Sequence, residues 1–377
     1  MDLGLPGADS PARQAVRAFL RAHPSPSGAE LAAAGYVAPH WPRPWGLEAS
    51  AVDQLVIDEE LRAAKVARPF NPIGIGWAGP TLLAGGTVAQ QQRYLPRLLS
   101  GEDLWCQLFS EPDAGSDLAA LSTSAVADGE EFIISGSKIW TTIAHLSRYG
   151  ILLARTDPGA ERHQGISYFV CDLTLPGITI APLVDLTGVH QFNQVFFDEV
   201  RLPADALVGR LHGGWELAKV TLANERVSLS GEGALWGRGP TADDLVDVLR
   251  ASGRPLRATE RQRVAQVVIE SEVLKMLRQR QVSSALLGRR DGASASVRKA
   301  LADEHGQHLM DLAKDLAGSA GTVVRRGPLG DEASNTLGWD WGFLYAQALT
   351  IGGGTSAVQR NIIAERLLGL PRDLDAS

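Results

Sequence analysis

The feature that most constrains the fold is a change of hydrophobic period along the 377-residue chain. Up to about residue 104, apolar side chains recur at helical spacing, beginning after Ser10-Pro11-Ala12. From about residue 104 to 207 the period is two, in short runs separated by Gly, Pro and Asp. From Gly213 onward, long amphipathic stretches return. One chain must therefore hold a β domain between two helical domains.

The predicted class is α+β, mainly α. We expect an N-terminal helical domain at 1–104, a central small β-barrel or sandwich at 105–210 and a C-terminal four-helix bundle at 211–377. The predicted β runs are 131–135, 151–155, 166–170, 178–180 and 192–197. The predicted long helices are 215–229, 260–287, 297–316 and 341–351, followed by a last helix at 355–368 that ends at Gly369.

Three local expectations follow from proline and glycine. Pro96 should break a helix that begins near Thr87 or open a short further turn that stops by Gly101. The segment 40–45, with prolines at 42 and 44, should be a loop whose two tryptophans pack against the protein. Ser135-Gly136 should be the turn of a hairpin formed by 130–134 and 137–140.

Composition and charge exclude several classes of protein. A net charge of -7 with interspersed signs argues against nucleic acid as the main partner. No window approaches 18 apolar residues, so we expect no membrane span. The first residues lack the pattern of a secretory signal, which leaves the cytoplasm as the expected location. Cys106 and Cys171 are then expected to be buried thiols rather than a disulfide.

The stretch 105–142 carries the clearest chemical pattern. Ser110 to Asp117 contains Pro112, which fixes φ and lacks a donor, and Gly115, which permits positive φ, so a sharp turn with free N–H groups is predicted. The strand that follows ends in Lys-x-Trp-x-Thr, with Trp140 and Thr142 beside that turn. An aromatic plate beside small hydroxyls suits a flat, edge-polar ring system such as a flavin.

These residues resemble the signature of the acyl-CoA dehydrogenase family, flavoproteins of lipid metabolism that oxidise the Cα–Cβ bond of CoA thioesters. The segment 352–371, Gly-Gly-Gly-Thr-Ser-Ala-Val-Gln-Arg followed by NIIAERLLGLP, resembles the C-terminal motif of the same family. The resemblance extends from about Ala15 to Pro371. It implies an FAD-dependent acyl-CoA dehydrogenase, an oxidoreductase acting on CH–CH bonds, with electron-transferring flavoprotein as electron acceptor.

The resemblance assigns roles to individual residues. Flavin contacts are implied for Phe109, Ser110, Gly115, Ser116, Trp140, Thr142 and Thr355, with Ser116 also near the pantetheine arm of the substrate. Where many relatives carry the catalytic glutamate, this chain has Gly353. Other relatives carry the base in an earlier Glu-Arg pair, which matches Glu225 and Arg226 here. Arg226 is then expected to steady the base, to contact the CoA side of the substrate or to form a structural salt bridge. The N–H of Gly353, together with a flavin hydroxyl, is expected to stabilise the thioester oxygen.

A second departure from the family concerns assembly. Homotetrameric relatives use an Arg-x-x-Phe-Gly segment to reach a neighbour's flavin, but the matching segment here, 256–263, has no Phe-Gly. Relatives with this change resemble subunits of mixed dehydrogenases. The chain is therefore expected to form a homo-oligomer or a heterotetramer with a related subunit. The alternative to a catalytic chain is a non-catalytic or cofactor-sharing subunit of a heteromeric acyl-CoA dehydrogenase.

Other candidate motifs are weaker. Gly74 to Gly79 matches G-x-G-x-x-G but follows Asn71-Pro72 rather than a strand, which argues against dinucleotide binding. His305 and His308 are one helical turn apart, but we expect a solvated helix face rather than a metal site. The motifs do not specify the acyl group, because chain-length selection depends on scattered pocket positions.

Overall fold

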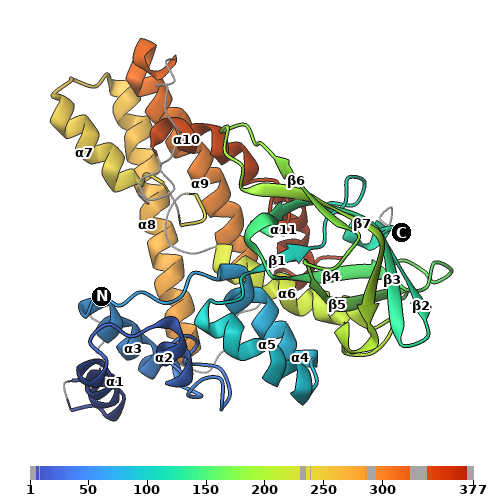
Figure 1. Ribbon diagram of the computed structural model, residues 1–377. Coiled ribbons are helices and arrows are strands. Elements are labelled where there is room, and N and C mark those ends of the chain that lie inside the picture. The colour runs from blue at the N-terminus through green and yellow to red at the C-terminus, as the bar shows by residue number, and fades with distance from the viewer. Residues whose placement is uncertain are drawn as a thin grey trace. The chain divides into compact units, whose positions relative to one another are not determined.

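The structure is a computed structural model that describes residues 6–7, 9–229, 235–237, 239–286, 294–322 and 338–371. The chain divides into two compact units, Met1–Leu183 with Phe192–Leu222, and Val184–Gln191 with Ala223–Ser377. Along the chain, helices precede a sheet and further helices follow it (Figure 1). This order confirms the predicted fold class, while the domain boundaries near residues 104 and 210 stay a prediction.

The first unit begins with helices, most of which start at a capping side chain. They are α1 (Pro11–Ala22), α2 (Gly28–Ala33), α3 (Ala51–Ala63), α4 (Gly79–Gly85) and α5 (Val88–Ser100). Ser10, Ser27, Ser50 and Thr87 each accept the backbone N–H three residues later, which satisfies one of the orphan donors of a helix start. The start predicted at Ser10 is confirmed. Gly74–Ala78 forms a wide helical turn before α4, so the glycine motif is part of a helical segment and follows no strand.

Two proline-based expectations had different outcomes. Helix α5 continues through Pro96 to Ser100 and ends at Gly101, whose φ is 78°, so the predicted break is wrong. Proline removes one N–H, but burial of Leu95, Leu98 and Leu99 stabilises the turns around it. The loop at 40–45 is confirmed, and Trp41 is 3% exposed. A Cβ on Gly79 would lie 2.0 Å from the Trp41 ring, so the indole needs a glycine beneath it.

The sheet of the first unit has eight strands. They are β1 (Trp105–Leu108), β2 (Ser124–Asp128), β3 (Glu131–Thr142), β4 (Tyr149–Arg155), β5 (Ile166–Asp172), β6 (Ile178–Leu183), β7 (Phe192–Pro203) and β8 (Leu207–Val208). The order is β6-β7-β3-β2-β4-β5-β8, with β1 parallel to β4. Strands β2 and β4 meet only at the pair Ser124–Arg155. This pair joins the strands β6-β7-β3-β2 to the strands β4-β5-β8.

Strand β4 explains why its sequence is apolar without alternation. Ile151 and Leu153 belong to a core shared with the helices, whereas Leu152 and Ala154 belong to a second core on the other face. Both faces of the strand are therefore buried, which favours a continuous apolar run. Cys106 and Cys171 are buried free thiols, as predicted.

The predicted hairpin turn at Ser135-Gly136 is wrong. Strand β3 runs without interruption from Glu131 to Thr142, and the hairpin turn lies between Asp128 and Glu131 instead. Gly136 has φ 144° and marks an irregularity in the pairing of β3 with β7. A glycine inside a strand pattern can thus mark a bulge rather than a turn.

Helix α6 (Gly214–Leu229) begins in the first unit and ends in the second, and the second unit continues with further helices. It contains α7 (Ala242–Ser252), α8 (Ala258–Leu286), α9 (Ser294–Ala317), α10 (Trp339–Tyr345) and α11 (Ser356–Ile362). The core of this unit includes Leu309, Met310 and Trp341, and Trp341 stacks on Tyr345 at 4.4 Å. Helix α7 was not predicted, and the predicted stretch 341–351 splits into α10 and a 3-10 turn, Ala346–Ala348.

Candidate functional site

The turn after β1 is closed by its own backbone. The N–H of Glu111 donates to the Ala114 carbonyl at 3.0 Å, and the N–H of Ala114 donates back at 3.1 Å. Gly115 is absent from the residues with positive φ, so the turn does not use the left-handed conformation that glycine permits. A Cβ on Gly115 would meet nothing within 4 Å, and Ser116 beside it is exposed. The chain itself gives no packing reason for the glycine, which leaves open surface at the turn.

A buried ion pair, which was not predicted from the sequence, connects this turn to β3. Lys138 Nζ lies 2.7 Å from Glu111 Oε1 and donates to the Phe109 carbonyl at 3.0 Å. The other carboxylate oxygen of Glu111 accepts the N–H and hydroxyl of Ser122 at 2.7 and 2.8 Å. Lys138 has no exposed surface and Glu111 is 5% exposed. The sequence signal was parity, because Phe132, Ile134 and Lys138 share one face of an alternating strand and a lysine there requires a buried partner.

The pair is charged at neutral pH. Burial alone raises the pKa of Glu111, but the Lys138 charge and the hydrogen bonds from Lys138, Thr123 and Ser122 outweigh it and hold the pKa at about 2. Burial lowers the pKa of Lys138 to about 8 despite the attraction of Glu111. The turn and the strand are thus connected by two full charges that are almost entirely buried.

Trp140 is presented by a strained backbone. Its φ is 58°, in the left-handed region, and it lies where the pairing of β3 with β7 shifts between Lys138 and Thr141. The indole is 58% exposed and touches Phe192 edge to face at 5.7 Å. A left-handed tryptophan is uncommon and such strain collects at functional sites. The bulge turns this large aromatic side chain outward from the sheet.

The neighbours of Trp140 differ in environment. Thr142 is half-buried and pairs with Phe192 across the ladder. Thr141 is 1% exposed, and its hydroxyl has no hydrogen-bond partner among the described residues. Ser110 is half-buried, and its carbonyl accepts the N–H of Ile139 at 2.9 Å. Ser110, Trp140 and Thr142 therefore belong to one connected structure within the first unit.

Phe109 contributes from the core. Its ring is 3% exposed and meets Tyr168 edge to face at 5.9 Å. The Tyr168 hydroxyl lies 3.0 Å from the hydroxyl of Thr221, which lies 2.8 Å from that of Thr81. This chain of hydroxyls connects β5, α6 and α4 beneath the turn. Phe109 supports the turn from below, and its carbonyl is taken by Lys138.

Glu225 and Arg226 lie on α6. Glu225 is 7% exposed, so its carboxylate is largely shielded from solvent. It follows Thr221, which is fully buried, by one helical turn. The side chain of Arg226 lies outside the described residues, so its predicted contact with substrate stays a prediction.

The C-terminal motif forms a tight turn before α11. Gly353 and Gly354 have φ values of 64° and 88°, which glycine alone adopts freely. Thr355 caps α11, because its hydroxyl accepts the N–H of Val358 at 3.2 Å. Within the part of the chain that the structure describes, the N–H of Gly353 makes no hydrogen bond. That N–H can therefore donate to a ligand.

The two histidines on α9 are joined by a carboxylate. Glu270 lies 3.1 Å from Nδ1 of His305 and 3.3 Å from Nδ1 of His308. His305 is 4% exposed, so the expectation of a solvated face holds only for His308. Among the described residues no group of three or more His, Cys, Asp or Glu side chains can hold a metal ion. In the same ranges no helix has the length and apolarity to cross a bilayer.

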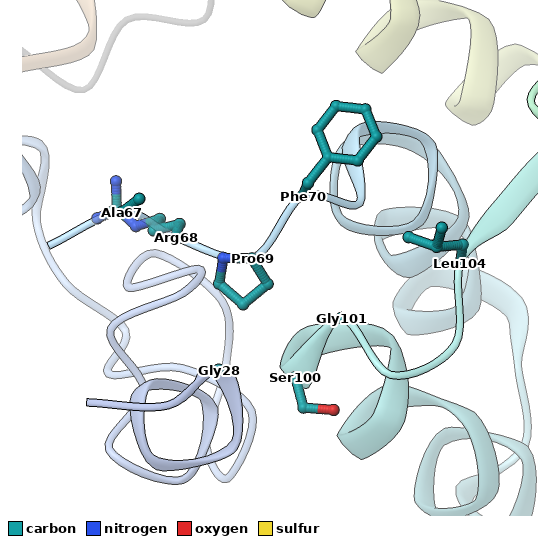
Figure 2. Close-up of a pocket in the computed structure, with 8 residues that line it drawn as sticks. All are labelled: Gly28, Ala67, Arg68, Pro69, Phe70, Ser100, Gly101 and Leu104. Carbon is teal, nitrogen blue, oxygen red and sulfur yellow. The ribbon is translucent and has the colours of Figure 1, made fainter. Parts of the chain in front are cut away.

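A separate pocket of about 400 Å³ lies in the first unit, between the start of α2, the end of α5 and the segment 67–70 (Figure 2). Its lining residues are Gly28, Ala67, Arg68, Pro69, Phe70, Ser100, Gly101 and Leu104. The Arg68 guanidinium is engaged by the Tyr36 carbonyl at 2.8 Å and by Asp58 at 2.6 Å. None of the predicted site residues lines this pocket, so it is distinct from the candidate site.

Comparison with known proteins decides the family. Three family models match successive parts of the chain: acyl-CoA dehydrogenase, N-terminal domain (residues 11–102), middle domain (106–200) and C-terminal domain (212–368). Acyl-CoA dehydrogenase IpdE1 of Mycobacterium tuberculosis is 37% identical over 98% of this chain and 92% of that relative. The chain belongs to the acyl-CoA dehydrogenase family. As a member it is an oxidoreductase of a flavoprotein family of lipid metabolism, which confirms the predicted enzyme class.

Further relatives of this acyl-CoA dehydrogenase extend the comparison. Acyl-CoA dehydrogenase FadE34 of Mycobacterium tuberculosis is 43% identical over 91% of this chain but only 46% of FadE34, so the chain spans less than half of that relative. The solved structure of Tcur3481-Tcur3483 steroid ACAD has a TM-score of 0.77 and 29% identity, over 97% of this chain and 94% of that one. The ChsE4-ChsE5 complex from Mycobacterium tuberculosis has a TM-score of 0.76 and 28% identity, over 99% and 100%.

Proposed function

We propose that this chain oxidises the Cα–Cβ bond of an acyl-CoA thioester to the trans-2-enoyl product, with bound FAD and with Glu225 as the base. The observation that carries the proposal is the presentation of Trp140. Its indole is 58% exposed on a left-handed backbone, two residues after a lysine whose buried ion pair connects the strand to the turn at Ser110. An exposed indole held this firmly suits stacking on a flat ring.

The residues around Trp140 fit a flavin. Gly115 leaves open space where a side chain would stand, and Ser116 exposes a hydroxyl beside it. Thr142 and Ser110 add small polar groups on the connected strand and turn, and Thr355 is assigned to the cofactor by the family motif. When bound, FAD supplies the hydride acceptor, which no protein side chain provides. The chain's own residues orient the ring and exclude water from it.

Glu225 is proposed to take the α proton. The family's other base position is Gly353, which has no side chain, so no carboxylate acts from that place. Glu225 is 7% exposed, which supports a carboxylate that meets the substrate away from bulk water. As the Cα–H bond breaks, negative charge develops on the thioester oxygen. The N–H of Gly353, which has no partner in the described chain, is proposed to donate to that oxygen.

We propose a mixed-subunit assembly, a bulky acyl group and electron-transferring flavoprotein as electron acceptor. The ChsE4-ChsE5 structure is a complex, and a second similar structure is a steroid ACAD, which supports a polycyclic acyl group. Within this chain, Arg257 pairs with Glu260 at 2.9 Å and Arg263 pairs with Asp315 at 2.7 Å. The arginines of the segment that lacks Phe-Gly are thus engaged inside their own chain, which supports a different contact with the neighbouring subunit.

The second candidate function is a non-catalytic or cofactor-sharing subunit. Gly353 in place of a glutamate and the missing Phe-Gly favour it. The first test is purification of the chain alone and together with its partner subunit, followed by the visible absorption spectrum. Yellow flavin on the chain alone supports the catalytic proposal. Flavin that is retained only with a partner supports cofactor sharing, and no flavin in either preparation contradicts the proposal.

Glu225→Gln tests the base, with Glu216→Gln as a matched control on the same helix. Glu216 is an exposed residue, 67% by its side chain, that pairs with Lys219. The measurement is anaerobic bleaching of the flavin by a panel of CoA thioesters, from short straight chains to polycyclic acyl groups. Removing a general base lowers the rate by about 10²–10⁴-fold, and the control should match the unmodified protein. Undiminished bleaching in Glu225→Gln would remove Glu225 from the base role.

A further inference from the structure

We propose that Gln359 is a positioning residue that fixes the Gly353–Thr355 turn and thereby aims the N–H of Gly353 at the substrate. The inference rests on the proposed function, in which that N–H stabilises the thioester oxygen. Gln359 lies on α11 and has no exposed surface. Its Nε2 donates to the Gly353 carbonyl at 3.1 Å and to the Gly354 carbonyl at 3.2 Å. One amide group therefore holds two successive peptide planes.

The turn needs such a clamp because of its composition. Glycine loses more backbone freedom on ordering than any other residue, and three glycines occur in succession. Gly353 and Gly354 both take left-handed values of φ. A Cβ on Gly354 would lie 2.6 Å from Nε2 of Gln359, and a Cβ on Gly352 would lie 2.7 Å from the ring of Trp236. The glycines allow Gln359 and Trp236 to approach the backbone closely, and Gln359 then restricts the freedom that glycine brings.

Different side chains hold the segment that leads into the turn. From α9, Lys299 Nζ donates to the Leu349 carbonyl at 3.3 Å. Gln307, also on α9, donates to the Ala346 carbonyl and to the Thr350 hydroxyl, both at 3.2 Å. Neither contact reaches the glycines. Gln307 is therefore a matched control for Gln359, since each glutamine makes two hydrogen bonds through Nε2 in the same unit.

Loss of the Gln359 hydrogen bonds should change how strongly a bound enolate is stabilised, and not only the stability of the protein. The N–H of Gly353 belongs to the peptide plane before the two that Gln359 holds, so Gln359 acts on it through the backbone angles of Gly353. When Gln359 no longer holds the two carbonyls, these glycine angles can vary and the N–H no longer points in one direction. A preorganised donor is effective because it needs no reorganisation as charge develops, and removal of one such donor typically costs about 10²–10³-fold in rate. Stabilisation of an enolate bound at the same place should weaken in parallel.

The test compares Gln359→Met, Gln307→Met and the unmodified chain as flavin-loaded proteins. The probe is acetoacetyl-CoA, whose bound enolate is titrated by its absorbance to give the apparent pKa of the α proton. Gln359→Met should raise that pKa by about one unit or more, equivalent to at least tenfold weaker enolate stabilisation. Gln307→Met should leave it unchanged even where it lowers the thermal midpoint as much as Gln359→Met does.

A pKa in Gln359→Met equal to that of the unmodified chain overturns the positioning role, and so does an equal rise in both variants. Where Gln359→Met does not fold, Gln359→Leu replaces it, because a leucine side chain cannot donate to either carbonyl and adds no charge near the probe. The pKa of the probe should rise in that variant too. If the unmodified flavin-loaded chain binds no probe, or the chain holds no flavin, the proposed function itself fails and this inference with it.

Discussion

Removal of Lys138 tests whether the buried ion pair organises the first unit. Within the pair, two effects oppose each other. The Lys138 charge and hydrogen bonds overcome burial and lower the pKa of Glu111 to about 2, whereas burial lowers the pKa of Lys138 to about 8 despite the attraction of Glu111. Removing one partner is different, because it leaves a buried charge without compensation at a cost of about 3–5 kcal/mol.

We therefore expect Lys138→Met and Glu111→Gln each to lower the free energy of unfolding by about 3–5 kcal/mol. The double variant should lose much less than the sum, because neither buried charge remains. Urea unfolding followed by circular dichroism measures the loss, and hydrogen exchange of the β3 amides assigns it to the first unit. The control is Arg201→Met, which breaks exposed pairs with Asp128 and Glu131 and should cost less than about 1 kcal/mol.

Additive losses, or single losses below about 1 kcal/mol, would refute the reasoning, because the cycle would then show no coupling between the two charges. The same variants also test whether the ion pair supports flavin binding. The pair connects the Ser110 turn to the strand that carries Trp140, so each single variant should also retain less flavin than Arg201→Met. Flavin retained equally by all three variants would limit the pair to a structural role.

Three further predictions concern pH, strain and an unpaired hydroxyl. Because the pKa of Glu111 is lowered on folding, the ionised carboxylate stabilises the fold at pH values above its unfolded pKa near 4.5, and this stabilisation is lost as the pH falls toward 2. The free energy of unfolding, measured against pH, should therefore show a slope in this range that Lys138→Met lacks. Gly354→Ala should lower the free energy of unfolding by about 1–3 kcal/mol or more, because the φ of 88° strains any residue with a Cβ and that Cβ would lie 2.6 Å from Nε2 of Gln359. Gly188→Ala is the control in the same urea assay, because Gly188 has a φ of 79° but open space around it, so its loss measures the backbone strain alone. Thr141→Val should stabilise by up to about 1 kcal/mol, because its buried hydroxyl has no partner among the described residues, and a loss in the urea midpoint would contradict this.

The sequence predicted the elements that depend on local periodicity. The helix start at Ser10, the long helices α8 and α9 and the main strands follow from repeating apolar positions and capping residues, which act over one or two turns. Helix α7 was missed because its signal, Thr241 followed by Asp244, comes directly after a glycine-rich segment. Pro96 and Gly136 were misinterpreted because burial and strand pairing outweighed their local preferences.

For the candidate site, the sequence motifs named Trp140, Glu225 and Gly353, but they did not show how the chain holds them. The ion pair of Lys138 with Glu111 connects residues 27 positions apart, and only the folded strand and turn bring those charges together. The left-handed backbone of Trp140 likewise arises from pairing between β3 and β7. Residue types and their period are local properties that the sequence carries by itself. Strain, burial and long-range pairing depend on neighbours distant in the chain, so the tertiary structure decides them.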